Sequence, residues 1–141
     1  MKRTAQAVWT GKFSDGSGTF KSGTGAITGA YSAPTRFGDE IGTNPEELIA
    51  AAHAACFSMA LTAGLNRDGI EPKSVETTAE VTIEKLDEGW RIVHIHLTTV
   101  ADIPGGDAAV FVEKAEGAKK SCPISAALAA VPSITLDAKL K

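Results

Sequence analysis

Residues 42–48 read Gly-Thr-Asn-Pro-Glu-Glu-Leu and open the longest apolar segment of the chain, which continues to Asn66. This segment predicts a long helix. Asn44 suits the N-cap, and Pro45 suits the first helical position, because the N–H group that proline lacks would have no helical partner there. The two glutamates that follow suit the positive end of the helix dipole. Gly69 is expected to end the helix, since glycine readily adopts the left-handed conformation found just after the C-cap.

The expected helix is apolar on all sides. One stripe contains Leu48, Ala52, Cys56, Met59, Ala60 and Ala63, and the opposite side contains Ala50, Ala54, Phe57 and Leu61. A helix without a polar face is typical of a buried element, so we expect a long buried central helix. Its many alanines would also permit close approach of a neighbouring helix.

Strands are expected on both sides of this helix. The expected strands cover 5–10, 19–22, 26–31, 75–83, 90–101 and 134–140, with a second helix over 107–120 and a further helical segment over 125–130. Residues 32–42 are expected to form a loop. The order of elements predicts an α+β fold of antiparallel sheets with helices packed on them, in a single domain spanning 1–141.

Alternation of side chains predicts which faces are buried. In 75–83 the odd positions are apolar or small, and the even positions carry glutamate or threonine. In 90–101 the residues Val93, Ile95 and Leu97 alternate with Ile92, His94 and His96. The two strands therefore predict a hairpin with one buried face. In the second helix, whose expected cap is Asp107, the expected apolar face consists of Ala109, Val112, Ala115 and Ala118.

Composition excludes several classes of protein. Hydrophobic residues make up 43% and charged residues 22% of the 141 residues, which is ordinary globular usage and argues against disorder and coiled coil. The net charge of −3 argues against nucleic acid as a partner. We expect no membrane partner, judging that no apolar run reaches the roughly 18 residues of a transmembrane span. No apolar signal-peptide core follows Met1, so we expect a cytoplasmic protein whose cysteines are thiols.

The two cysteines differ in their surroundings. Cys56 lies in the middle of the apolar helix, where a free cysteine is most often a small core residue and is inert unless a cation reaches it. Two lysines at 119 and 120 precede Cys122, and Pro123 follows it as the first position of an expected helix. The positive charge of the lysines and the positive end of the helix dipole would both lower the pKa of its thiol. The alternative for Cys122 is a residue that merely marks a helix break. By position alone, Cys122 is the more reactive thiol.

Other polar residues are ambiguous when taken singly. Arg36 alone would be a solvated surface charge, and Glu46 is a first-turn acid that any helix favours. His53 lies one turn before the helix cysteine and could serve as its base, although a structural histidine is the simpler interpretation. His94 and His96 share a strand face, but without a third ligand they favour a solvated face over a metal site.

Three segments gain meaning together. Residues 42–48 are followed at 51–61 by Ala-Ala-His-Ala-Ala-Cys-Phe-Ser-Met-Ala-Leu. Residues 118–125 read Ala-Lys-Lys-Ser-Cys-Pro-Ile-Ser, and residues 34–37 read Pro-Thr-Arg-Phe. These segments resemble the signature helix, the second cysteine motif and the arginine segment of the OsmC/Ohr family, which comprises osmotically inducible protein C and the organic hydroperoxide resistance proteins. The resemblance extends over nearly the whole chain and favours the OsmC branch.

The resemblance implies an OsmC-like fold, an intertwined homodimer and a thiol peroxidase of the oxidative or osmotic stress response. It implies that Cys56 reduces organic hydroperoxides, and hydrogen peroxide more weakly, and becomes a sulfenic acid that Cys122 converts into a disulfide. Arg36 would hold the Cys56 thiolate, and Glu46 would orient Arg36. A lipoyl-type dithiol is the implied reductant, and no metal or organic cofactor is implied.

Physical reasoning adds to the resemblance. Arginine stays charged at physiological pH and suits a thiolate, and apolar residues around Cys56 favour an alkyl peroxide by about 0.8 kcal/mol per buried methylene. Glu46 and Cys56 are ten residues apart, or about 15 Å along a helix, which is too far for one Arg36 to bridge within a chain. A homodimer with sites shared between subunits would remove this conflict. Two alternatives stay open: a redox-sensing or ligand-binding module, and a Cys-His thiol hydrolase that uses Cys56 and His53.

Overall fold

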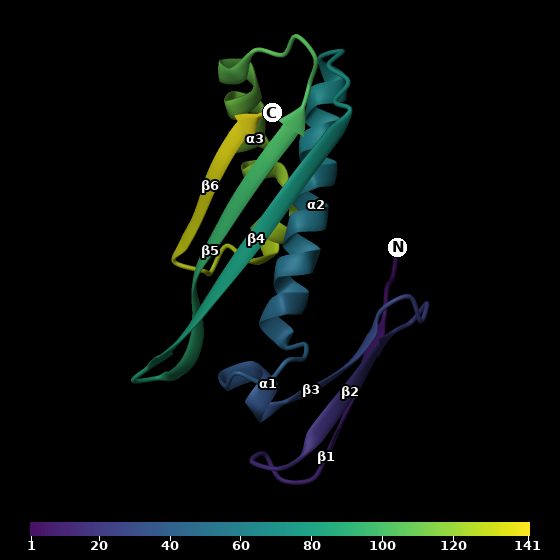
Figure 1. Ribbon diagram of the computed structural model, residues 1–141, viewed down its shortest axis with the longest axis vertical. Helices are drawn as coiled ribbons and strands as arrows, with labels where there is room; N and C mark the ends of the chain where they lie inside the picture. The colour runs from purple at the N-terminus through teal and green to yellow at the C-terminus, as the bar shows by residue number, and fades with distance from the viewer. The chain divides into compact units, whose positions relative to one another are not determined.

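The computed structural model describes residues 1–141, which divide into two compact units, Met1–Leu48 and Ile49–Lys141. Figure 1 shows the elements of each unit. The expectation of a single domain over 1–141 stays a prediction.

The first unit is built on a three-stranded antiparallel sheet. Its strands are β1 (Ala5–Thr10), β2 (Ser17–Ser22) and β3 (Thr28–Ser32), which pair in this order. All three strands were expected from the sequence. Tyr31 of β3 lies opposite Gly18 of β2, where an added Cβ would lie 2.4 Å from the tyrosine ring, so any larger residue would force the ring to move.

The expected loop over 32–42 is partly wrong, because it contains a short helix, α1 (Ala33–Phe37). Ser32 caps this helix, and Thr35 completes a capping box: the Ser32 Oγ accepts from the Thr35 N–H, and the Thr35 Oγ1 accepts from the Ser32 N–H at 2.9 Å. The Thr35 hydroxyl also donates to the Thr43 carbonyl at 3.0 Å. The signals in the sequence are the Ser32–Thr35 capping box and Pro34 in the first turn, but a helix of five residues is too short to show an apolar periodicity.

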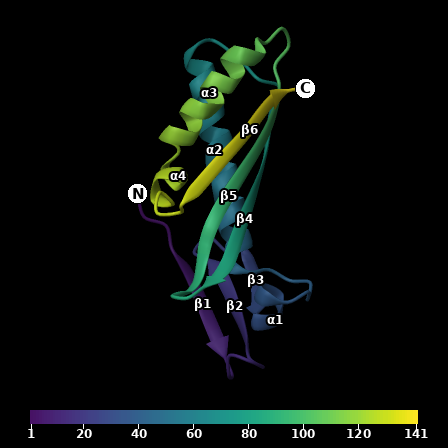
Figure 2. The same cartoon turned by 90° about the vertical axis from the view of Figure 1, so that its left-hand side faces the viewer.

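The second unit contains one sheet and the helices that cover it. Its elements are most of α2 (Pro45–Arg67), then β4 (Ser74–Leu86), β5 (Gly89–Asp102), α3 (Ala108–Ser121), α4 (Pro123–Ala127) and β6 (Ser133–Leu140). The strands pair in the order β4-β5-β6. Helices α2 and α3 lie on the same face of this sheet, as the two perpendicular views show (Figures 1 and 2).

The ends of α2 and the start of α3 confirm the expected caps. The Asn44 Oδ1 accepts from the Glu47 N–H at 2.9 Å, and the Asp107 side chain accepts from the Val110 N–H at 2.9 Å. Gly69 has a φ of +75°, and the Ile70 N–H donates to the Leu65 carbonyl at 3.0 Å. These bonds satisfy backbone groups that would otherwise lack a partner where the helix ends.

The expectation of purely antiparallel sheets is wrong for the second sheet. β4 and β5 form the expected antiparallel hairpin, whereas β6 runs parallel to β5, with His94 paired to Ser133. Parallel neighbours need a crossover connection, and α3 and α4 provide it. The sequence shows the strand and the helices, but periodicity carries no information on strand direction.

The alternation expected for β5 fails at Val93. Thr82 pairs with His94 and Ile83 pairs with Ile92, so Val93 is an extra residue in a β-bulge. Ile92 consequently lies on the same face as Ile83 rather than on the face of His94. Beyond the bulge the expected pattern is confirmed, and Ile95, Leu97 and Ala101 are fully buried.

The core lies between α2, α3 and the sheet. Its buried members are Phe57, Leu61 and Leu65 of α2, Leu97 and Ala101 of β5, Phe111, Ala115 and Ala118 of α3, and Cys122. The expected apolar face of α3 is therefore half wrong: Phe111 takes the buried position, whereas Ala109 and Val112 are exposed. Alanine and valine periodicity alone does not reveal that Phe111 anchors this helix in the core.

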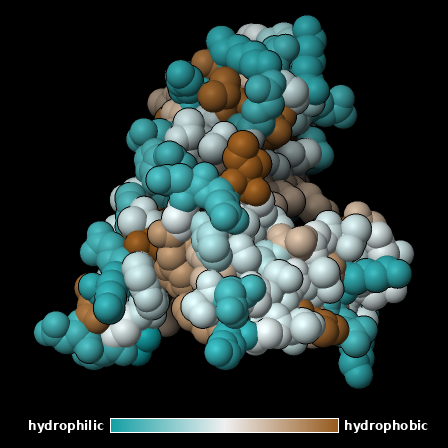
Figure 3. Space-filling view, turned by 60° about the horizontal axis from the view of Figure 1, so that its bottom comes forward, coloured by the Kyte–Doolittle hydropathy of each residue, from teal (hydrophilic) through white to brown (hydrophobic).

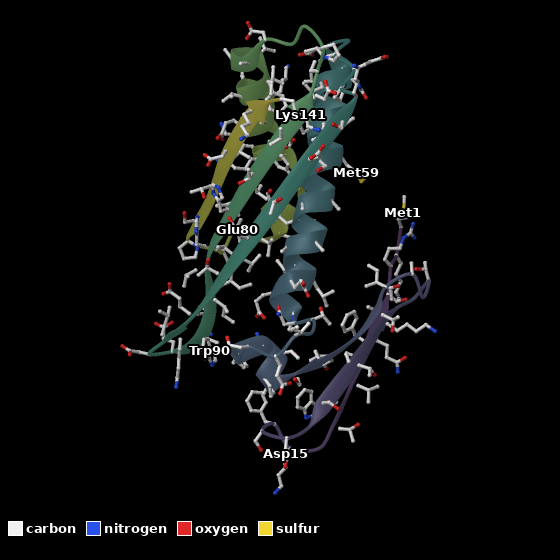
Figure 4. All side chains as sticks on the ribbon, in the orientation of Figure 1. Met1, Asp15, Met59, Glu80, Trp90 and Lys141 are labelled. Carbon is white, nitrogen blue, oxygen red and sulfur yellow. The ribbon has the colours of Figure 1, made fainter.

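The expectation that α2 is buried all round is also wrong. Met59 is 75% exposed and projects from α2 away from the sheet (Figure 4). Ala51, Ala52, Ala55 and Ala63 are exposed with it. The helix therefore keeps an apolar stripe that the single chain does not cover. Figure 3 shows hydrophobic patches among hydrophilic residues on the face that it displays.

The expectation that no apolar run could span a membrane needs correction. By length and composition alone, α2 is long and apolar enough to do so. The core helix of a soluble protein can have the same length and composition. Phe57, Leu61 and Leu65 pack against the sheet and α3, and this packing accounts for the apolar composition of one side.

We predict that Leu61→Ala destabilises the protein strongly. The side chain is fully buried in the core, so its removal leaves a cavity and should cost about 2–5 kcal/mol in the free energy of unfolding. Val112→Ala is the matched control on an exposed surface, where a change within about 0.5 kcal/mol is expected. Urea unfolding followed by circular dichroism measures both, and equal losses in the two variants would contradict this description of the core.

Candidate active site

The two cysteines lie together in the second unit. Cys56 comes from the middle of α2, and Cys122 comes from the break between α3 and α4, where it ends one helix and begins the next. Both are free thiols, Cys56 half-buried and Cys122 fully buried. Their side chains interact by a hydrogen bond. Two thiols this close can be joined by a disulfide after one of them is oxidised.

The surroundings shift the two pKa values in opposite directions. Burial, and next the shared hydrogen bond with Cys122, raise the pKa of the Cys56 thiol, although the backbone N–H of Ile124 opposes them. Burial also acts to raise the pKa of Cys122, but the backbone N–H groups of Ser125 and Ile124 and the side chains of Cys56 and Ser125 outweigh it and lower that pKa. Within this unit the negative charge is therefore favoured on Cys122, as its position before Pro123 suggested.

His53 belongs to the same cluster. Its Nε2 lies 2.8 Å from the Ser125 Oγ, and both residues are buried. The His53 Nδ1 is buried without a partner, and burial lowers the pKa of the imidazole. The partner of His53 is thus Ser125 and not Cys56, which agrees with the structural role expected for it.

Ser125 is the site residue that sequence reasoning missed. It lies three residues after Cys122, at the third position of α4, while Cys122 is the N-cap of that helix. Both its side chain and its backbone N–H interact with the Cys122 thiol. The signal for it in the sequence is its place within the 118–125 motif, three residues after Cys122.

Arg36 and Glu46 form the second pair, and they lie in the first unit. The Arg36 Nε donates to the Glu46 Oε2 at 3.0 Å, and its Nη2 donates to the Oε1 at 2.6 Å. This fork geometry is the strongest form of a charged pair, and it fixes the guanidinium plane. The Phe37 ring lies 4.9 Å from the Arg36 Cζ. Nη1 is left for another ligand, and the arginine side chain is 33% exposed.

The chain thus brings together Arg36 with Glu46 in one unit and Cys56 with Cys122 in the other. An apolar pocket of about 180 Å³ lies in the same unit as Arg36. It is lined by Ala7, Phe20, Tyr31, Asn44, Pro45 and Leu48.

The two strand histidines do not form a metal centre. His94 Nε2 and His96 Nδ1 lie 2.8 and 2.7 Å from the Thr135 Oγ1, and the His96 Nε2 lies 3.4 Å from a carboxylate oxygen of Asp137. No group of three or more histidine, cysteine or acidic side chains is placed to hold a metal ion. The solvated face that the sequence favoured describes these residues.

An α+β fold with two adjacent thiols, and an arginine whose guanidinium is held by a glutamate, is typical of a thiol-based redox protein. Residues 38–137 of the chain match the family described as OsmC-like protein. Peroxiredoxin OsmC of Escherichia coli is 46% identical over 142 residues, which cover 100% of this chain and 98% of that protein. Organic hydroperoxide resistance protein-like 2 of Staphylococcus epidermidis is 33% identical over 112 residues, or 77% of each chain.

Solved structures agree with these relatives. The organic hydroperoxide resistance protein OsmC of Legionella pneumophila superposes with a TM-score of 0.78 at 25% identity over 96% of each chain. The organic hydroperoxide resistance protein of Elizabethkingia anophelis gives a TM-score of 0.77 at 26% identity over 99% of each chain. The chain belongs to the OsmC family, which confirms the family resemblance seen in the sequence and the OsmC-like fold with two three-stranded sheets and a long helix.

We predict that His53 makes folding pH-dependent. Burial lowers the pKa of His53 in the folded chain. As the pH falls, the imidazole of the unfolded chain is therefore protonated near pH 6.5, whereas that of the folded chain is protonated only at lower pH. This contribution to stability is full above about pH 6.5 and is lost as pH falls through the lowered folded pKa, by up to about 1.4 kcal/mol per pH unit. His53→Gln lacks it, so the stability difference between wild type and variant should shrink on acidification.

Urea unfolding of both proteins at about pH 7.5 and about pH 5.5 measures this difference. The variant is its own control for all other titrating groups, which the two proteins share. A constant difference across this range would contradict a neutral buried His53.

Proposed function

We propose that the protein is a thiol-dependent peroxidase that reduces organic hydroperoxides, and hydrogen peroxide more weakly, to alcohols and water. The observation that carries this proposal is the pairing of a half-buried Cys56 with a fully buried Cys122. The family membership and the full-length peroxiredoxin relative confirm this class of enzyme.

The proposed cycle first oxidises Cys56 and then joins it to Cys122, and both reactions proceed with the two sulfur atoms and the peroxide alone. The Cys56 thiolate attacks the terminal oxygen of the peroxide, the O–O bond breaks, and the alkoxide takes a proton and leaves as alcohol. Cys56 is then a sulfenic acid. Cys122 attacks the Cys56 sulfur, the S–O bond breaks, and water is released as the disulfide forms. A dithiol then reduces the disulfide and becomes a disulfide itself.

Accessibility favours Cys56 for the first step. A peroxide must reach the sulfur that it oxidises, and only Cys56 of the two is partly exposed. The raised pKa of Cys56 runs against this role, because the thiolate is the nucleophile. The assignment therefore requires a cation beside Cys56 in the active form. Arg36 suits this role, since Glu46 holds one edge of its guanidinium and leaves Nη1 for the thiolate or the peroxide.

The active form we propose is a homodimer with composite sites. Glu46 and Cys56 both lie in α2, about 15 Å apart along its axis, roughly twice the reach of an arginine side chain. Arg36 and Glu46 of one subunit would serve Cys56 of the other. The apolar stripe of α2 around Met59 supplies a surface of small residues for a close two-fold contact.

Substrate and reductant follow from the chemistry of the two units. The apolar pocket in the first unit suits an alkyl group, which hydrogen peroxide lacks, at about 0.8 kcal/mol per buried methylene. The reductant we propose is a lipoyl-type dithiol. Its first thiol attacks the protein disulfide, and its second thiol then closes a cyclic disulfide, so the mixed disulfide does not persist. A cycle that ends on a thiol reductant suits the cytoplasm, where thiols are kept reduced.

The two alternatives make different demands. A Cys-His hydrolase needs His53 beside Cys56, but His53 bonds to Ser125. A redox sensor would use the same cysteine pair without turnover. Steady-state consumption of tert-butyl hydroperoxide with dihydrolipoamide, compared with glutathione, separates a peroxidase from a sensor.

We predict that the two cysteines are both required but not equivalent. Cys56→Ser should abolish peroxide reduction, because the accessible nucleophile is lost. Cys122→Ser should react once and leave an oxidised Cys56 without an intramolecular disulfide. Mass spectrometry after one equivalent of peroxide distinguishes these products. A single turnover that survives in Cys56→Ser and vanishes in Cys122→Ser would reverse the assignment.

We predict that two inactive variants restore activity when their subunits exchange. Arg36→Ala chains keep both cysteines, and Cys56→Ser chains keep Arg36, so a mixed dimer has one complete composite site. Up to about half of the mixed dimers' sites should work. The control is a mixture of Cys56→Ser with the double variant Arg36→Ala/Cys56→Ser, which cannot form a complete site. No recovery after proven exchange would exclude composite sites.

A further inference from the structure

A line of polar side chains runs from α2 into the cysteine pair, and the cycle above does not use it. The His53 Nε2 lies 2.8 Å from the Ser125 Oγ. Ser125 occupies the third position of α4, Cys122 occupies its N-cap, and the serine side chain forms a hydrogen bond with the Cys122 thiol. All three residues are buried. Buried polar groups in such a line polarise one another more strongly than they would in water.

The direction of the hydrogen bonds follows from the donors available. A serine hydroxyl has one proton, so it can donate to only one of His53 and Cys122. If the His53 Nε2 carries its proton and donates to Ser125, the serine proton is free for the sulfur of Cys122. The unpartnered His53 Nδ1 is then a lone pair rather than a buried N–H group. The opposite tautomer would place an N–H there and would take the serine proton away from Cys122.

We propose that His53 is a positioning residue for the resolving thiol: it orients the Ser125 hydroxyl so that it donates to Cys122 and holds that sulfur as the attacking thiolate. The description of Cys122 as the resolving thiol rests on the proposed function, whereas the contact between His53 and Ser125 does not. Ser125 and His53 touch no peroxide in this scheme. Their effect is confined to the second sulfur step.

Disulfide formation between Cys122 and the oxidised Cys56 needs no further reactant. The Cys122 thiolate attacks the Cys56 sulfur of the sulfenic acid, the S–S bond forms, and the S–O bond breaks. The hydroxide that leaves combines with the proton that Cys122 released on ionisation and gives water. Ser125 and His53 keep their protons, because they donate hydrogen bonds and transfer nothing.

The shifts in the cluster agree with this direction. The Ser125 side chain is among the groups that lower the pKa of Cys122 against the effect of burial, as a donor to a thiolate does. The titratable groups that face Cys122 come from α2: Cys56 directly, and His53 through Ser125. Burial lowers the pKa of His53, so the imidazole stays neutral and adds no charge of its own.

The test measures the ionisation of Cys122 without any peroxide. In a Cys56→Ser background, thiolate absorbance in the ultraviolet is followed against pH, which needs no reagent to reach the buried sulfur. His53→Leu removes the donor at similar volume, and Ser125→Ala removes the hydroxyl. Each should raise the pKa of Cys122 by about one unit, which is about tenfold less thiolate at neutral pH. His53→Gln and Ser125→Thr keep a donor and should leave the pKa near its value in the background.

Single-turnover kinetics with both cysteines present provides the second readout. Oxidation of Cys56 should keep its rate in His53→Leu, while disulfide formation should slow about tenfold. An unchanged Cys122 pKa in both His53→Leu and Ser125→Ala would overturn the proposal, whatever their stability. If His53→Leu does not fold, Ser125→Ala against Ser125→Thr decides. Failure of the proposed function would look different, as absence of peroxide reduction in the wild type.

Discussion

The packing of α2 against the sheet and α3 holds the site of this protein together. Phe57, Leu61 and Leu65 anchor one face of the helix, and Phe111 anchors α3 in the same core. Because Cys56 lies one residue before Phe57, the hydrophobic contact that stabilises the unit also sets the position of the thiol. Cys122 belongs to that core as well, so the geometry of the thiol pair depends on core packing rather than on a loop.

Sequence reasoning succeeded where the signal is local. Asn44 and Gly69 mark the ends of α2 because caps satisfy backbone groups within a few residues. The family motifs identified both cysteines for the same reason: their neighbours in sequence are distinctive. It failed where the answer depends on distant partners. The parallel direction of β6, the bulge at Val93 and the exposed side of α2 are set by what packs alongside, which periodicity does not encode.

The candidate site shows the same division. The Arg36–Glu46 pair and the thiol pair were expected by resemblance, but the opposing pKa shifts of the two thiols come from burial and from hydrogen bonds of α4. Ser125 escaped notice because a serine near a helix start has an ordinary structural use. These details distinguish the two sulfur atoms chemically: Cys56 is half-buried with a raised pKa, and Cys122 is fully buried with a lowered pKa.

The crossover that carries Cys122 also sets the order in which the second unit can fold. β4 and β5 are neighbours in sequence, so their hairpin closes a short loop, whereas the pairing of His94 with Ser133 must first close the long segment that contains α3 and α4. Contacts between distant residues form late. Until β6 arrives, one edge of β5 lacks its neighbour, and an unpaired edge invites association with other chains. Cys122 lies inside the segment that this pairing closes, so conditions that delay the arrival of β6 would leave the edge of β5 exposed while the chain around this thiol is still incomplete.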